Sequence, residues 1–153
     1  MKYKRLTAEE LAVLEQDFIH FLSSAQITGQ DWEKMKKEES AKAEELIEVF
    51  SDVVYDKVLG KIQFLEFRDE RTINIFHFGP DKIRLAGFRV KDNSKLDLTK
   101  ENVLEQWKEH HGSVNVIKTE KEYSSGREIE IFEMLQSGCM ITDDQLFKLL
   151  NEL

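Results

Sequence analysis

Residues 73–90 read INIFHFGPDKIRLAGFRV, and this segment indicates that the chain is not all-helical. β-branched and aromatic residues, which are typical of strands, dominate both halves, and Gly79-Pro80-Asp81-Lys82 between them has the composition of a turn. The segment predicts an antiparallel hairpin with strands at 73–78 and 83–90. The apolar alternation of the second strand slips by one position, and a bulge at Ala86-Gly87 would restore it.

The first strand of this hairpin is apolar on both faces. Ile73 and Ile75 lie on one side, and Phe76 and Phe78 lie on the other. Strands with that pattern are buried on both sides. We therefore expect other elements to cover each face, and we expect a third strand at 113–118 to extend the sheet.

Helix starts are marked by one phrase used four times: an aliphatic residue, Thr, two variable residues, a short polar residue and an apolar residue. The phrase stands at Thr7, Thr28, Thr99 and Thr142. The Thr side chain can accept a backbone N–H as an N-cap, and the residue three positions later can reach back. The sequence thus predicts four capped helices.

The spacing of apolar residues gives the extent of each helix. The predicted helices cover about 8–25, 28–39, 43–68, 99–112 and the residues after 142. The third passes through Gly60, where a mid-helix glycine costs about 1 kcal/mol relative to Ala.

Residues 126–136 fit two structures. Glu128 to Ile131 alternates like a strand, whereas Ser125 with Glu128 matches a capping box and Gly138 stands where a helix would stop. We predict a helix here. The whole pattern predicts a single α+β domain over residues 1–153. Its helical part, at about 1–68, packs on a small, mainly antiparallel sheet of about three strands within 69–153, with further C-terminal helices.

Composition limits the class of protein. The 153 residues carry a formal net charge of −8, which disfavours a general attraction to nucleic acid or anionic lipid. A single cysteine excludes an intramolecular disulfide. No apolar stretch follows the basic start Met1-Lys2-Tyr3-Lys4-Arg5, so we expect a cytoplasmic protein without signal peptide or membrane span.

An acidic stripe is the clearest surface feature. Glu44, Glu48, Asp52 and Asp56 recur every four residues on the third predicted helix, opposite its apolar face. Such a stripe is most often a solvated helix face. The sharper interpretation is an electrostatic docking surface for a basic protein partner.

Histidine and cysteine offer little chemistry. His110 and His111 are adjacent, so their side chains diverge by about 100° and do not form the i, i+4 pair used by metal sites on helices. His77 lies in an apolar strand, where a hydrogen-bonded histidine is the commoner role. Cys139 follows Gly138 and is interpreted as a small buried hydrophobe. We expect no metal and no cofactor, and the sequence assigns no catalytic residue.

Three functions are compatible with these residues. The first is a small noncatalytic interaction protein, as a homodimer or with another partner, that uses the acidic stripe. The second is an enzyme with a pocket around His77 and carboxylates that the thirty acidic residues do not identify. The third is nucleic-acid binding by the hairpin through Phe76 and Phe78, which the negative net charge opposes.

Three segments carry a resemblance to a known family. They are the opening run Lys2 to Leu11, the turn Pro80 to Ile83, and the run Glu130 to Cys139. Together they resemble an uncharacterised family of small bacterial cytosolic proteins with no assigned function. The resemblance implies a bacterial cytosolic protein and transfers no catalytic residue.

Overall fold

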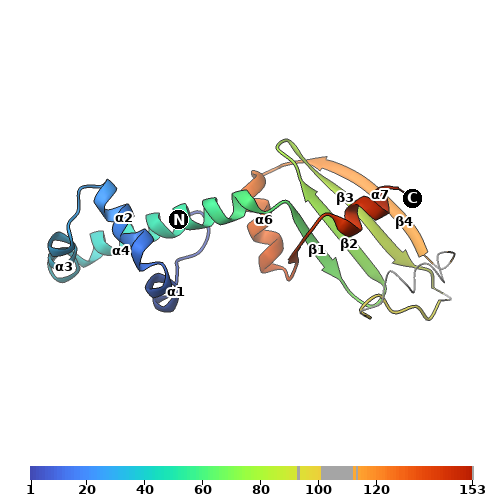
Figure 1. The fold of residues 1–153 in the computed structure, drawn as a ribbon, viewed down its shortest axis with the longest axis horizontal. Helices are drawn as coiled ribbons and strands as arrows, with labels where there is room; N and C mark the ends of the chain where they lie inside the picture. Colours follow the sequence, from blue (N-terminus) through green and yellow to red (C-terminus); the bar gives the residue numbers. More distant parts are fainter. Residues whose placement is uncertain (93, 101–111, 113, 153) are drawn as a thin grey trace. The chain divides into compact units, whose positions relative to one another are not determined.

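The computed structural model describes residues 1–92, 94–100, 112 and 114–152. These residues form two compact units, Met1–Gly60 and Lys61–Leu153. The first is helical, and the second contains a five-stranded antiparallel sheet with helices (Figure 1). The predicted α+β class is confirmed, although the sheet has five strands instead of three. The prediction of one domain stays a prediction.

Helices build the first unit, and two of their starts follow the repeated threonine phrase. The helices are α1 (Ala8–Val13), α2 (Glu15–Ser24), α3 (Gly29–Glu38) and α4 (Ser40–Lys61). Thr7 and Thr28 each cap a helix in a complete capping box, with Glu10 and Asp31 as the reciprocal partners. The helix predicted over 8–25 is divided in two, because the backbone leaves helical geometry at Leu14.

Aromatic side chains form the centre of the first unit. Phe50 of α4 is buried and lies 5.0 Å from the ring of Phe18 and 5.3 Å from that of Phe21, both on α2. Trp32 of α3 meets Phe18 edge to face at 5.1 Å. Three helices therefore share one aromatic cluster, whose pairs add to the free energy gained by burial.

Helix α4 ends at Lys61, so the prediction that it continues to 68 is wrong. Residues Phe64–Arg68 instead form strand β1, which pairs antiparallel with β2 (Thr72–Phe78). Leu65 fits a helical period and a strand equally well when only its neighbours in sequence are considered. Pairing along both of its edges, with β2 and β5 (Met140–Thr142), decides for the strand.

The sheet has the strand order β4-β3-β2-β1-β5, in which β3 is Lys82–Val90 and β4 is Val114–Glu122 (Figure 1). The predicted hairpin is confirmed as β2 and β3, and the predicted third strand is confirmed as β4. The predicted bulge at Ala86-Gly87 is wrong, because the pairing of β2 with β3 is continuous from Thr72 to Phe78. The apolar alternation slips because β3, like β2, buries side chains on both of its faces.

A helix lies against each face of the sheet, as the apolar pattern of β2 predicts. On one face, here called the α7 face, Ile73, Ile75 and Phe88 form a core with Leu150 of α7 (Gln145–Asn151). Figure 1 shows α7 in front of β2 and β3. The opposite side is called the α6 face, because Met134 of α6 (Arg127–Gln136) lies against it.

Helix α6 confirms the predicted helix at 126–136, but Ser125 does not cap it. The carboxylate of Glu130 instead accepts the backbone N–H groups of Ser124, Ser125 and Gly126 at 3.0, 3.3 and 3.3 Å. At the other end Gly138 takes a left-handed conformation, with φ +106°, as predicted for the residue that stops this helix.

The other two threonine phrases have different outcomes. Thr142 is not an N-cap, because it is the last residue of β5 and pairs with Phe64; α7 begins three residues later, after Asp144. The helix predicted at 99–112 falls mainly on residues 101–111. They lie outside the described residues, and so do His110 and His111.

Candidate functional site

The acidic stripe lies on α4, where the N-terminal segment of the chain binds it. This segment, residues 1–6, contacts Glu44, Asp52 and Asp56. Glu48, the fourth acid, makes no hydrogen bond or ion pair with any residue that the structure describes. A stripe predicted to receive a basic partner is thus in contact with a basic segment of the same chain.

Two aspartates hold the beginning of the segment. Asp52 accepts the backbone N–H of Lys2 at 2.9 Å and that of Tyr3 at 3.2 Å. Asp56 accepts the Tyr3 hydroxyl and the Lys2 ammonium, the latter at 3.1 Å. The hydroxyl first, and then the ammonium, hold the pKa of the Asp56 carboxyl below its ordinary value, against a rise from burial.

The end of the segment is anchored in the interior. Leu6 is 5% exposed, and its N–H donates to the hydroxyl of Ser51, which is 0% exposed, at 3.0 Å. The same hydroxyl donates to the Ile47 carbonyl at 2.7 Å. Arg5 forms an ion pair with Glu44. A buried anchor at Leu6 is therefore followed, toward the N-terminus, by contacts that are partly or fully exposed.

The contacts between this surface and the segment are hydrogen bonds and ion pairs. Its carboxylates accept backbone N–H groups, a phenol and two cations, which are the groups that an extended basic peptide offers. The ion pairs are exposed, so each contributes about 0–1 kcal/mol. Sequence spacing located the acids but not the segment that binds them. The one signal was the complementary charge of Lys2-Tyr3-Lys4-Arg5.

His77 lies on the α7 face of β2, stacked on the ring of Phe64 at 4.8 Å and close to that of Phe147 at 5.5 Å. Burial, and after it the positive charges of Arg84 and Arg127, lower its pKa. His77 lines a pocket of about 270 Å³ with Asp81, Lys82, Arg84 and the turn residues Gly79 and Pro80. One carboxylate thus shares its pocket with two cations, and the enzyme hypothesis stays a prediction.

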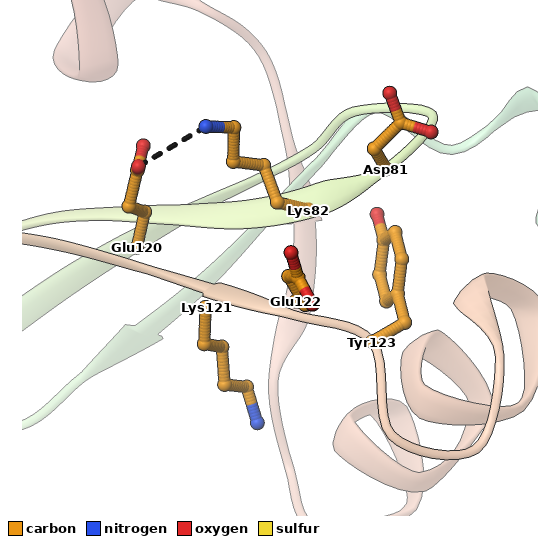
Figure 2. Close-up of a pocket in the computed structure, with 6 residues that line it drawn as sticks. All are labelled: Asp81, Lys82, Glu120, Lys121, Glu122 and Tyr123. Atoms are coloured by element: carbon orange, nitrogen blue, oxygen red, sulfur yellow. Dashed lines mark hydrogen bonds and ion pairs between the residues drawn. The ribbon is translucent and has the colours of Figure 1, made fainter.

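A larger pocket of about 750 Å³ lies beside the hairpin turn. Its lining is polar and charged: Asp81, Lys82, Glu120, Lys121, Glu122 and Tyr123 (Figure 2). Lys82, Glu120 and Tyr123 already have partners, because Lys82 binds Glu120 at 3.1 Å and the Tyr123 hydroxyl donates to the Gly79 carbonyl at 2.6 Å. Lysine, tyrosine and carboxylate side chains take part in catalysis in many enzymes, so the types of these six residues do not by themselves assign a reaction to the pocket.

Two basic side chains of the hairpin lie on the face opposite to Phe76. Phe78 is 1% exposed and cannot stack on a base, whereas Phe76 is half-buried on the α6 face. Strand alternation directs Lys82 and Arg84 to the α7 face, together with His77. Arg89 lies on the same face as Phe76, where its guanidinium donates to the Asn74 side chain at 2.7 Å. The nucleic-acid hypothesis is untested.

Metal and thiol chemistry have no geometric support within residues 1–92, 94–100, 112 and 114–152. Within them, no three His, Cys, Asp or Glu side chains are placed to hold a metal ion. Cys139 is half-buried, and burial raises the pKa of its thiol, which disfavours the reactive thiolate. No helix among the described residues is long and apolar enough to cross a membrane.

Comparison with known proteins places the chain in a family but assigns it no activity. No curated protein and no solved structure matches it. One family model, described as a family of unknown function (DUF6495), matches residues 1–153. The resemblance to an uncharacterised family is thereby confirmed over the whole sequence, and the chain belongs to the family of unknown function DUF6495.

Proposed function

We propose that this chain is a noncatalytic, cytoplasmic interaction protein whose acidic face on α4 binds an extended basic segment of a partner protein. One observation carries the proposal: the N-terminal segment already lies along this face. The four acids of the sequence prediction, Glu44, Glu48, Asp52 and Asp56, form the docking surface.

The contacts of the segment define the ligand chemistry. Asp52 binds two consecutive backbone N–H groups, which any extended peptide carries. Asp56 and Glu44 bind the groups that distinguish this peptide: a lysine followed by a tyrosine, and an arginine two residues further on. A partner segment with the same order of cation, aromatic and cation fits this surface.

Exchange between the chain's own segment and a partner is physically reasonable. The ion pairs of Lys2 and Arg5 have side chains about half exposed, so salt and water weaken them. Residues 1–5 can therefore leave the surface while the buried Leu6 stays in place. A partner segment would then form contacts of the same kind as those that residues 1–5 have left.

The test compares three proteins by binding a fluorescent peptide with the sequence of residues 1–7, measured as anisotropy at low salt. An opened variant, Lys2→Ser with Tyr3→Ser and Arg5→Ser, should bind the peptide more tightly than the unmodified chain. Adding Asp52→Asn and Asp56→Asn to the opened variant should abolish this binding. A peptide with its cations replaced by Gln is the matched ligand control.

Absence of binding to the opened variant, with its helix content unchanged by circular dichroism, would refute the proposal. Equal binding after the two Asp→Asn changes would also refute it, because the acids would then contribute nothing.

A second copy of the chain also carries this basic segment, so a homodimer is one form of the proposed function. Sedimentation velocity over a concentration series measures self-association directly. If two copies associate through this surface, the opened variant should be monomeric at concentrations where the unmodified chain dimerises. A dimer that persists in the opened variant uses another surface.

A further inference from the structure

Helix α6 leaves part of its face of the sheet uncovered, and a pocket of about 410 Å³ lies there. It is lined by Phe76, Ile83, Leu85, Thr119, Glu120, Lys121 and Met134. This volume is within the range of about 300–1,000 Å³ that is usual for small-molecule sites. The pockets beside it, around the hairpin turn, are lined mainly by charged and polar side chains.

The floor of this pocket is apolar and continuous across three strands. Cross-strand pairing places Phe76 beside Leu85, and Ile83 beside Lys121, on the α6 face. Ile83 is buried, and Phe76, Leu85 and Met134 are half-buried. Met134 supplies a flexible thioether wall that can adapt to a ligand chain. The floor therefore suits an unbranched apolar group.

One charged group stands at the edge of this floor. Figure 2 shows the Lys121 side chain pointing to the opposite side of β4 from Glu120. The carboxylate of Glu120 is bound by Lys82 at 3.1 Å and Arg84 at 3.6 Å on the α7 face. Of the two charged residues that line the pocket, Lys121 is therefore the one whose side chain lies on the α6 face.

Lys121 is also available to a ligand. Its side chain is 67% exposed, and its ammonium lies 3.8 Å from Oε1 of Glu130, which is a loose ion pair. The other oxygen of Glu130 accepts three backbone N–H groups, so this carboxylate remains compensated when Lys121 turns away.

We propose that this pocket binds a single-chain amphiphile with an anionic head group, of the fatty-acid class. The chain lies over Phe76, Leu85 and Met134, and the carboxylate meets the Lys121 ammonium, with the Thr119 hydroxyl at the same edge. This site is separate from the acidic face of α4 and does not depend on the function proposed for that face.

The experiment titrates the full chain with a dansyl-labelled fatty acid below its critical micelle concentration. Saturable binding with a stoichiometry of one is expected. Unlabelled dodecanoic acid should displace the probe more effectively than dodecanol. Lys121→Gln should weaken the carboxylate by about fivefold, as expected for one ion pair at a partly exposed site, and leave the alcohol unchanged.

Two further variants locate the ligand. Leu85→Trp fills the pocket from the sheet, and Met134→Trp fills it from α6. Each variant should abolish binding, so the second can test the proposal if the first does not fold. Lys118→Gln is the matched control, because Lys118 lies on the same strand but pairs with Ala86 on the α7 face, and it should bind like the unmodified chain.

Three results would overturn the proposal. These are the absence of saturable binding, retention of binding in both filled variants, and equal weakening by Lys118→Gln and Lys121→Gln. Binding only to vesicles that contain an anionic lipid, and not to the free acid, would also overturn it. In that case the attraction would belong to a membrane surface and not to a pocket for one chain.

Discussion

Ser51 connects the N-terminal segment to α4 through one buried hydroxyl, so Ser51→Ala is the change that should loosen the segment most directly. The hydroxyl accepts the Leu6 N–H at 3.0 Å and donates to the Ile47 carbonyl at 2.7 Å. In the variant the Ile47 carbonyl keeps its position in the helix. The Leu6 N–H is left without its acceptor at a residue that is almost completely buried.

The size of the effect follows from this loss. A buried donor without a partner costs about 1–3 kcal/mol, against which Ala has a slightly higher helix propensity than Ser. A net cost of about 2 kcal/mol raises the population with a detached segment roughly thirtyfold. The compact unit Met1–Gly60 should be destabilised by the same amount if the segment and the helices unfold together.

Limited trypsin digestion measures the detachment, because Lys2, Lys4 and Arg5 are its cleavage sites in the segment. Cleavage after Arg5 should accelerate in Ser51→Ala, and urea unfolding should give the accompanying loss of stability. Ser23→Ala, at an exposed position of α2, is the matched control. Equal cleavage rates in the two variants would refute the assignment of Ser51 as the anchor.

Three other changes test the fold and the segment. In urea unfolding, Gly87→Ala should destabilise the protein by about 1–3 kcal/mol, because the new Cβ would lie 2.8 Å from a carbonyl oxygen of β2. Gly60→Ala, with open space around it, should stabilise the protein by up to about 1 kcal/mol. A change of the same sign in both variants would contradict this expectation. Glu130→Gln should lower stability by about 1–2 kcal/mol through its three N–H contacts, and Glu133→Gln, exposed on the same helix, should not. The pKa of Asp56 is lowered in the folded state, so its contribution is complete above the unfolded value of about 4 and is lost as pH falls through the folded value. The NMR signals of residues 1–6 should therefore change as the pH is lowered into the acid range, because the segment is released there. If these signals stay unchanged until the whole unit unfolds in acid, Asp56 does not hold the segment.

Elements specified by neighbouring residues could be predicted from the sequence. Thr7 and Thr28 cap helices because their reciprocal partners are only three residues away. The same phrase at Thr142 does not cap a helix, because its backbone pairs with Phe64, which is 78 residues earlier in the chain. Local propensity is a weak signal wherever strand pairing competes for the same residues.

Strand β1 shows that local sequence can also predict a helix where distant pairing produces a strand. Leu65 fits the helical period of the residues before it, and no turn signal as strong as Gly79-Pro80 separates α4 from β1. The strand exists because β2 and β5 offer it hydrogen bonds on both edges. The first of these partners begins four residues after β1 ends, but β5 begins 72 residues after it, so the helical period of the residues before Leu65 could not reveal the pairing.

The acidic stripe was visible in the sequence, but its partner was not, because Asp52 and Asp56 lie about fifty residues from Lys2 and Tyr3. Their contact gives the stripe a physical role that spacing alone could not. Like charges four residues apart on a helix are destabilising by roughly 0.2–0.5 kcal/mol per pair, so the stripe costs free energy when it is bare. The N-terminal segment offsets that cost with two cations and two backbone N–H groups. When the segment detaches, the repulsion returns and the acids again favour any basic segment within reach. The arrangement that stabilises α4 is therefore also the one for which we propose a receptor role, and competition between the chain's own segment and a partner is the property on which the proposed function depends.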